Sequence, residues 1–292
     1  MSAIFSLLGF ITAVLLGSAL LCWPVHQLLG LVTDYPFHKL LGHLTLVLGL
    51  AGSFVYLSLN GMLDRRGCGY GTGKKPFLKQ VGIGLLIGNL VLLVIELLLL
   101  VLGLHVPEPG LTPGVSWIIE LVFIAAVTGL VVGLTEETIF RGAIQGVLMK
   151  HLKVIPAVLL SSFAYAALHF IKFPELPANI DPDWHSGLSL LADSFKYGYF
   201  TYNFDKFITL LLLGVLLGTL RAINGNIALC IGVHAGLVMM MKISRKLTDY
   251  VPGSELDFLV NYTDHQLGWL STFILAIVVI GYILIHTKGD KR

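Results

Sequence analysis

The sequence predicts an all-α polytopic membrane protein, folded as a single integral membrane domain over residues 1–292 with about eight transmembrane helices. Two observations carry this prediction. The composition is 56% hydrophobic with a mean hydropathy of +0.86, and only 12% of the residues are charged, whereas soluble domains carry about 25% charged residues. Runs of about 20 apolar residues, long enough to cross a bilayer, also recur along the chain.

The apolar runs place eight spans in order. They lie near residues 4–23, 40–60, 80–104, 115–150, 156–171, 207–222, 227–244 and 267–286. The fourth span is too long for one crossing. We therefore expect it either to tilt and protrude or to break near Gly129 or Gly133, and the sequence does not choose between these.

The charged residues limit the partners. The net charge is only +2, and the Lys and Arg residues lie in loops and tails rather than on one basic face, so no nucleic-acid partner is expected. The loop at residues 64–75 is basic and rich in glycine, but it has no preceding strand and no GxGxxG or GK[ST] motif. We interpret it as a flexible linker and expect no nucleotide. The partners that remain are membrane lipids and a membrane-associated peptide or protein.

The same loop sets the expected orientation. Loops rich in Lys and Arg usually stay in the cytoplasm, which would place both termini of an eight-span chain in the cytoplasm as well. The long segment from about residue 172 to 206 would then lie outside. Its many aromatic side chains favour the membrane interface, so we expect an in-plane segment or a lid rather than free coil.

The stretch Gly133–Gly142 places two carboxylates and a guanidinium inside an apolar helix, where charges are costly. Glu137 and Arg141 are four residues apart, so they can pair on one helical face. Glu136 lies about 100° round the helix and has Phe140 four residues ahead, which leaves its carboxylate available. The alternative is a helix that has just emerged at the membrane surface with a solvated Glu–Arg pair.

Two histidines also lie in apolar spans, His169 and His234. If the chain turns back near Lys153, Glu136 and His169 are each roughly 25 Å from the turn and come out level. His234 is only about 15 Å beyond a turn near Asn224, so a common depth requires tilt or a protruding turn. Either histidine alone is more often a satisfied interior residue.

Glu96 is a further acid within an apolar span. It is expected to be protonated or paired, and a structural role is favoured over a catalytic one.

A carboxylate and two imidazoles that converge in the membrane can hydrolyse a peptide bond in two ways. The carboxylate can deprotonate water while the imidazoles donate to the oxyanion of a tetrahedral intermediate. Alternatively, Glu136, His169 and His234 can hold a divalent metal such as zinc, which lowers the pKa of a bound water. The HExxH and GxSxG motifs are absent from the chain, as are paired intramembrane aspartates.

Three motifs resemble the signature of a known family. Glu136-Glu137-x-x-x-Arg141, the segment from Tyr165 to His169, and the His-Ala pair at His234 are similar to those of the CAAX protease and bacteriocin-processing (CPBP) family. These intramembrane endopeptidases include the eight-helix CAAX prenyl protease 2 and bacterial abortive-infection proteins. The resemblance covers about residues 115–245, which would form the catalytic core.

The resemblance implies a role for each motif residue. Glu136 would be the water-activating base, with Glu137 and Arg141 as its supporting pair. His169 and His234 would be catalytic or metal-binding. Two positions depart from the family pattern: Tyr165 replaces the usual Phe, and Val238 replaces the Asn or Asp that usually follows the last histidine by four residues. The candidates to replace that amide or acid are Asn224, Asn226, Ser161 and Ser162, and no spacing argument selects one.

The function expected from these residues is an intramembrane endopeptidase, with or without a metal, that cleaves a membrane-associated polypeptide. A bacterial inner (plasma) membrane is the expected location, because the compact chain has short loops. The alternative is a non-catalytic membrane scaffold or bacteriocin-immunity protein, for which Val238 is the evidence. A transporter that relays protons is a weaker reading, since no inverted repeat is visible.

Overall fold

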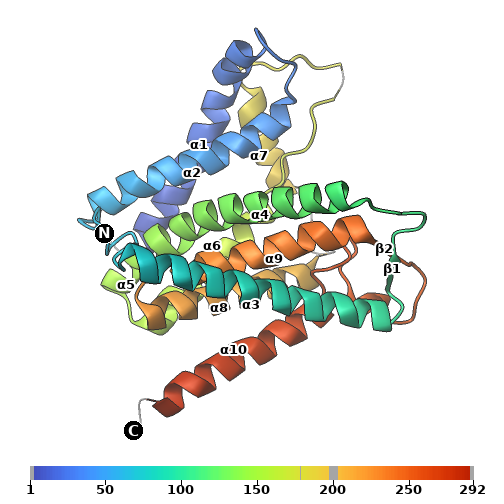
Figure 1. The fold of residues 1–292 in the computed structure, drawn as a ribbon. Helices are drawn as coiled ribbons and strands as arrows, with labels where there is room; N and C mark the ends of the chain where they lie inside the picture. The colour runs from blue at the N-terminus through green and yellow to red at the C-terminus, as the bar shows by residue number, and fades with distance from the viewer. Residues whose placement is uncertain (1–2, 178, 197–202, 290–292) are drawn as a thin grey trace.

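The computed structural model describes residues 3–177, 179–196 and 203–289 (Figure 1). The helices are α1 (Ala3–Leu29), α2 (Phe37–Leu59), α3 (Lys74–Val101), α4 (Val115–Glu137), the π-helical turn η1 (Thr138–Ile144), α5 (Gln145–His151), α6 (Val154–Leu168), α7 (Ser186–Lys196), α8 (Phe204–Asn224), α9 (Ala228–Leu247), the short 3-10 turn η2 (Asp257–Leu259) and α10 (Trp269–Gly289). Two three-residue strands, β1 (His105–Pro107) and β2 (Thr248–Tyr250), pair antiparallel.

The all-α polytopic prediction is confirmed. Within the described residues, six helices are long and apolar enough to cross a membrane: α1, α2, α3, the continuous helix Val115–His151, α8 and α9. Two shorter apolar helices, α6 and α10, occupy the two remaining predicted spans. Each of the eight apolar runs in the sequence therefore corresponds to one apolar helix.

The fourth span does not break at its glycines. It runs as one helix of 37 residues from Val115 to His151, and its only change of pitch is the π-helical turn η1, which begins directly after Glu137. Gly129 lies instead against α9, where an added Cβ would come within 2.4 Å of the Ala235 carbonyl oxygen. The glycine permits close helix packing rather than a kink.

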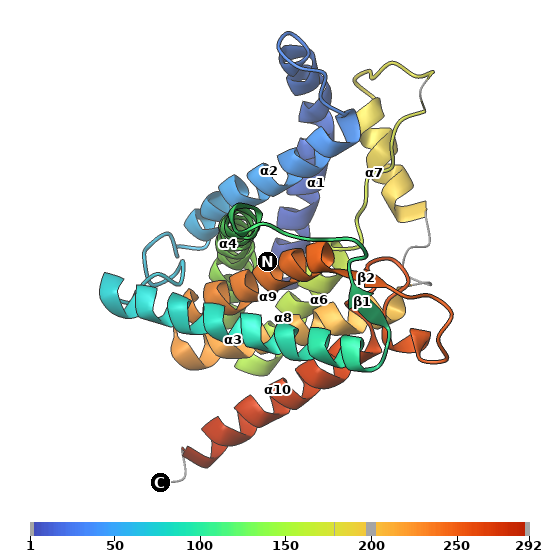
Figure 2. The same cartoon turned by 45° about the vertical axis from the view of Figure 1, so that its right-hand side comes forward.

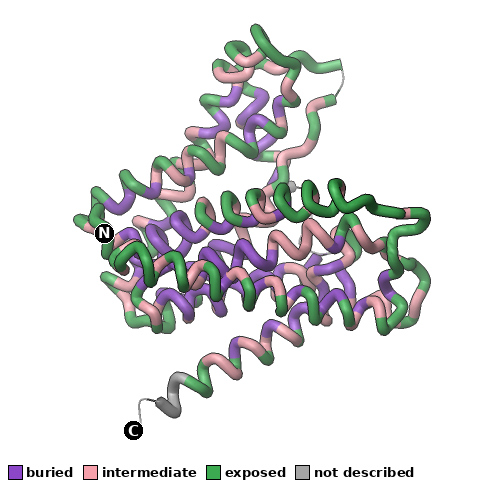
Figure 3. Tube along the Cα trace, viewed as in Figure 1, coloured by how far each residue is buried: buried purple, intermediate pink, exposed green. Residues whose placement is uncertain are grey.

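Helices α8 and α9 form the centre of the bundle. Of their apolar windows 56% is buried, compared with 17% for α1 and 17% for the long helix that contains α4. Figure 3 shows the buried positions concentrated where α6, α8 and α9 meet, with α1 and α2 rising from that layer. The side chains that project from α4, α6 and α9 toward this centre are consequently the ones withdrawn from lipid and water.

The helix ends divide the chain between two faces. Lys150 Nζ donates to the Asn60 carbonyl oxygen at 2.6 Å, and Ile227 N donates to the Gly69 carbonyl oxygen at 3.0 Å, so the turns at residues 60–79, 150–154 and 222–228 meet on one face. These segments contain seven Lys or Arg residues and one acid, Asp64. We call this the basic face.

Both ends of the described chain approach the basic face. Ala3 lines a cavity together with Asn60 and His151, and Asn224 Nδ2 lies 3.1 Å from Tyr282 Oη, which places the last turns of α10 beside the end of α8. The β1–β2 ribbon closes the opposite face, where it joins the end of α3 to the end of α9 (Figure 2). The two described ends of the chain therefore lie toward the same side of the bundle.

The glycine-rich loop is packed, and the prediction of a flexible linker is wrong. Cys68 is buried, and the Tyr70 hydroxyl lies 2.6 Å from Thr138 Oγ1 in η1. Gly69 adopts φ +83°, and an added Cβ there would lie 2.7 Å from the Ile227 side chain. The loop therefore covers the α8–α9 turn and keeps it below the basic face.

The aromatic segment contains one amphipathic helix, α7, which packs against α1. Figure 1 shows α7 beside α1 and α2, apart from the main layer of helices. Residues 178 and 197–202 of this segment lie outside the described residues. The helical part agrees with a structured segment rather than free coil.

Candidate active site

The two adjacent glutamates end α4 at the centre of the bundle, and the π-helical turn follows them. Glu137 is fully buried, whereas the Glu136 side chain is 19% exposed. Because neighbours on a helix point about 100° apart, one carboxylate faces the protein interior and the other faces a cavity. Single π-helical turns inside α-helices are frequent at functional sites, because the extra residue redirects side chains.

Glu137 is held on two sides. Its Oε1 accepts hydrogen bonds from Arg141 Nη1 at 3.1 Å and from His234 Nδ1 at 2.8 Å. Arg141 is 1% exposed, and its Nη2 donates to the Gly214 carbonyl oxygen at 3.4 Å. The Arg141 guanidinium also lies over the Tyr165 ring, 4.5 Å from its centroid. The pair predicted from the sequence is present and buried, which contradicts the alternative of a solvated pair at the membrane surface.

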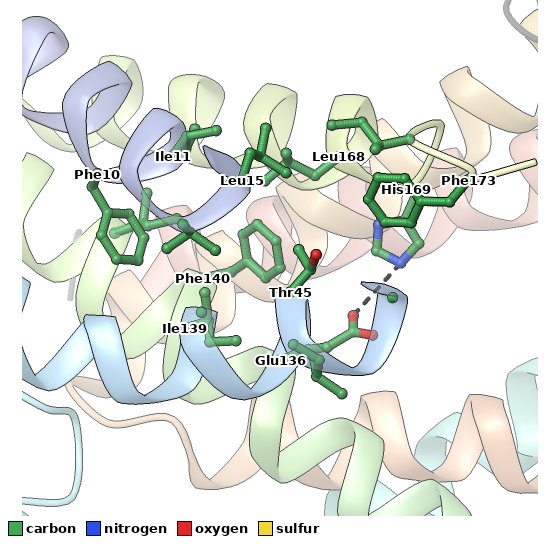
Figure 4. A pocket seen from close by; sticks show the side chains of 16 residues that line it. Phe10, Ile11, Leu15, Thr45, Glu136, Ile139, Phe140, Leu168, His169 and Phe173 are labelled. Atoms are coloured by element: carbon green, nitrogen blue, oxygen red, sulfur yellow. Dashed lines mark ion pairs between the residues drawn. The ribbon is translucent and has the colours of Figure 1, made fainter. Parts of the chain in front are cut away.

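His169 caps the C-terminal end of α6 and faces Glu136. Its Nδ1 lies 2.8 Å from the Tyr165 carbonyl oxygen, and its Nε2 lies 3.6 Å from Glu136 Oε2 (Figure 4). The chain turns at Leu152 and Lys153, between α5 and α6. The equal depth expected for Glu136 and His169 is what the structure shows.

His234 reaches the same carboxylate from α9, with Nε2 3.8 Å from Glu136 Oε2. The depth mismatch expected for this residue has a structural cause. Residues Asn226 to Ala228 are buried under the glycine-rich loop, where Ile227 N donates to the Gly69 carbonyl oxygen. Since α9 starts below the basic face, seven residues are enough to bring His234 to the level of Glu136.

The hydrogen bonds determine which imidazole nitrogens carry hydrogen. A carbonyl oxygen and an ionised carboxylate only accept, so His169 Nδ1 and His234 Nδ1 are both donors. In the neutral imidazoles, each Nε2 then has a lone pair. Glu136 Oε2, the atom that both Nε2 atoms face, is buried and has no hydrogen-bond partner. Three acceptors thus converge, an arrangement that favours a proton or a polar guest between them.

Two apolar cavities meet at this point. One, of about 310 Å³, lies between α1, α2 and η1 and is lined by Phe10, Phe140, Glu136 and His169 (Figure 4). The other, of about 190 Å³, lies among α3, α6, α8, α9 and α10 and is lined by Glu136, His169 and His234. The Glu136 carboxylate and the His169 ring are the polar groups shared by both cavities, so a chain passing from one to the other would cross them.

Val238 lies one turn after His234 and lines the 190 Å³ cavity with Glu136. The four residues considered as substitutes for an amide there do not line either cavity: Asn224, Asn226, Ser161 and Ser162. Two hydroxyl residues that sequence reasoning missed, Thr209 and Ser271, do line it. Neither motif nor helical spacing marks them, because α8 and α10 reach the cavity only through the tertiary fold.

Glu96 is part of a separate network near the β-ribbon. Its Oε1 accepts from His105 Nδ1 and from Thr248 Oγ1, both at 2.8 Å, and its Oε2 lies 3.4 Å from Gln266 Nε2. These contacts tie α3, β1, β2 and the loop before α10 together. Glu96 therefore holds these elements together, which is the structural role favoured from the sequence.

The metal expectation was tested against the arrangement of donors. Within the described ranges, no group of three or more His, Cys, Asp or Glu side chains is arranged to hold a metal ion. His169 and His234 each donate from Nδ1 to a protein acceptor, and their Nε2 atoms lie 3.6 and 3.8 Å from Glu136 Oε2. Metal-ligating histidines usually donate their other nitrogen in this way, so these two Nε2 atoms and the Glu136 carboxylate are the atoms that would hold a metal ion.

Residues 118–240 match the family described as type II CAAX prenyl endopeptidase Rce1-like. Over this segment, the chain is similar to the CAAX protease family. The matched segment contains all three motifs and the helices that carry them, α4 to α9. No curated protein and no solved structure matches the chain. The matched segment thus spans the central bundle from near the start of α4 to near the end of α9, with α1, α2, α3 and α10 outside it.

Proposed function

We propose that the protein is an intramembrane endopeptidase that hydrolyses a peptide bond of a membrane-associated polypeptide. The catalytic core would be residues 115–245 of a single membrane domain. One observation carries this proposal: Glu136 Oε2 is buried without a hydrogen bond, faces two imidazole nitrogens, and lies where two apolar cavities meet. The family match supports a protease at the level of the family.

In this mechanism Glu136 is the general base. A water beside Oε2 gives its proton to the carboxylate, and the oxygen attacks the carbonyl carbon of the substrate. The resulting tetrahedral oxyanion collapses when the carbon–nitrogen bond breaks. The proton held by Glu136 then passes to the departing amine, which restores the carboxylate.

The imidazoles stabilise the oxyanion. Because Nδ1 of each ring already donates to a fixed acceptor, an imidazole donates from Nε2 only when it is protonated. Two carboxylates and one guanidinium leave the cluster with one excess negative charge, and a proton on His169 or His234 balances it. In a low-dielectric interior, a balanced cluster is strongly favoured over an unbalanced one.

Glu137 and Arg141 position these groups. Glu137 fixes the orientation of His234, and Arg141 keeps Glu137 ionised and in place. The Tyr165 ring lies between Arg141 and His169, with its centroid 4.4 Å from that of the imidazole and the two rings tilted by 56°. Its hydroxyl is not needed for this contact, which accounts for a Phe being the usual residue in the family.

The orientation proposed is with the basic face in the cytoplasm, in a bacterial inner membrane. The structure supports it because seven Lys or Arg residues and one acid gather on that face. Ala3 and the last turns of α10 approach the same face, in agreement with two cytoplasmic termini.

A membrane scaffold or immunity protein is the second candidate. Val238 favours it, since an apolar side chain occupies the cavity position where the family has an amide or an acid. A scaffold requires the folded helix bundle but does not require Glu136 as a general base.

The test of the main proposal is cleavage by the purified chain. The protein would be reconstituted in liposomes with a set of membrane-anchored peptides, and new peptide termini would be identified by mass spectrometry. We expect termini that appear with the wild type and are absent with Glu136→Gln. Equal products from both proteins would contradict the proposal. Activity that a chelator removes and a divalent metal restores would assign the water activation to a metal instead.

A further inference from the structure

A cleft of about 840 Å³ lies between α1 and α2, two of the helices long and apolar enough to cross a membrane. It is larger than either cavity at the candidate active site. Its walls are apolar side chains and small residues, and Gly9 faces open space, with no atom within 4 Å of an added Cβ. Its volume falls in the range of about 300–1,000 Å³ typical of small-molecule sites.

The cleft is separate from the candidate active site. Phe10 and Val14 line both spaces and form the partition between them. Phe10 is held there by stacking on Tyr56, with the ring centroids 4.8 Å apart. A molecule in the cleft would therefore contact α1 and α2 without reaching Glu136.

The end of the cleft at the basic face is polar. Asn60 and His151 line it, and the Lys150 ammonium lies beside it because it donates to the Asn60 carbonyl oxygen. That bond uses one of the three ammonium hydrogens and leaves two for another acceptor. Lys153 follows three residues after Lys150, and Asp64 is the single acid in the turns of this face. The local charge thus favours an anion.

A buried polar atom also lines the cleft. Tyr56 is 4% exposed, and its hydroxyl lacks a hydrogen bond of normal geometry. Its polar neighbour is Ser6, which lines the same space. Buried hydroxyls are nearly always satisfied, and Ser6 is the nearby partner here, so the two hydroxyls form a polar spot in the otherwise apolar wall of the cleft.

We infer that this cleft binds one anionic phospholipid. An acyl chain would lie between α1 and α2, and the ester region would meet the Tyr56 hydroxyl. The phosphate would lie at the basic end, near Lys150 and His151. Basic residues at the cytoplasmic ends of helices bind anionic headgroups, and an apolar cleft that opens to lipid is filled by a chain more readily than by water.

The test uses the full chain in detergent, with phosphatidylglycerol and phosphatidylcholine as probes and native mass spectrometry to titrate the first bound lipid. We expect phosphatidylglycerol to bind more tightly. Gly9→Leu should weaken that binding about tenfold by filling the cleft. The matched control is Gly82→Leu on α3, another exposed glycine with no atom within 4 Å of an added Cβ, and it should bind as the wild type does.

A second pair of variants tests the headgroup and does not change the cleft. Lys150→Ala should reduce the preference for phosphatidylglycerol about fivefold, and Lys39→Ala, at the other end of α2, should leave it unchanged. Equal affinity for the two lipids, or equal effects within either pair of variants, would overturn the inference and leave only non-specific surrounding lipid. Because no step involves cleavage, these results are independent of the proposed activity.

Discussion

His234 Nδ1 lies 2.8 Å from Glu137 Oε1, and this hydrogen bond orients the imidazole. Since the carboxylate only accepts, the ring must carry its hydrogen on Nδ1. Its other nitrogen then faces Glu136 Oε2 at 3.8 Å. Glu137 therefore determines which imidazole nitrogen faces Glu136, although the two carboxylates point to different parts of the structure.

Removing the partner of that buried glutamate should destabilise the fold. Arg141→Ala would leave Glu137 ionised without its guanidinium, and breaking a buried pair typically costs about 3–5 kcal/mol. Arg141→Lys should recover only part of this, because an ammonium cannot contact Glu137, the Gly214 carbonyl and the Tyr165 ring together. Thermal unfolding in detergent measures the effect. Lys153→Ala is the control, and equal Tm values for it and Arg141→Ala would show that the pair is unimportant.

Val238→Asn should keep the fold and raise any proteolysis. Val238 is half-buried and lines the cavity together with Glu136, so an amide at this position can donate a hydrogen bond to an oxyanion. Such a contact contributes about 10²-fold or more to the rate. Cleavage rate and Tm would be measured on the same preparation. A large drop in Tm with no gain in rate would mean that the position serves apolar packing.

The glycine-rich loop should be intolerant of a side chain at Gly69. Gly69→Ala would place a Cβ at φ +83° and 2.7 Å from Ile227, which should cost roughly 1–3 kcal/mol and displace the start of α9. Gly73→Ala is the matched control, because that residue has φ −60° and only ordinary contacts. If both variants unfold at the wild-type temperature, the loop does not hold the α8–α9 turn.

Apolar periodicity and helical spacing predict much of this protein. The eight apolar runs correspond to eight apolar helices. The equal distance of Glu136 and His169 from a turn at Lys153 predicted that their side chains lie close together, as they do. The depth of His234 was not predictable, because it depends on a turn buried under a loop 150 residues earlier in the chain.

Other features escaped sequence reasoning for a similar physical reason. The π-helical turn after Glu137 is a local change of pitch that has no residue signature. The partners of Glu96 are residues of two strands and a loop, 9 to 170 positions away, and the pairing of the strands brings them together. Periodicity reports which face of a helix is apolar, not which loops fold over it.

The β-ribbon network should make stability depend on pH. His105 donates from Nδ1 to Glu96 and from Nε2 to the His265 carbonyl, and only the imidazolium can make both bonds. Burial acts to lower the pKa of His105, but the hydrogen bond and charge of Glu96 outweigh it, so the pKa is raised. The stabilisation is therefore complete below about pH 6.5 and is lost as the pH rises through the raised pKa.

The measurement is Tm across about pH 6 to pH 9. The difference in Tm between the wild type and His105→Gln should shrink as the pH rises. His185 is exposed, so the Tm of His185→Gln should equal that of the wild type at every pH. A difference between wild type and His105→Gln that is constant with pH would contradict the imidazolium assignment.

The most direct test of the central claim is the cleavage rate of Glu136→Gln in liposomes with a substrate that the wild type cuts. Glutamine keeps the size of the side chain but removes the base, so the rate should fall by about 10²–10⁴-fold while Tm stays close to wild type. His169→Ala and His234→Ala should each lower the rate too, and double variants should lose little beyond the single ones, because residues that act as one unit are not additive. If Glu136→Gln folds and cleaves at the wild-type rate, Glu136 is not the base and the hydrolase account is wrong.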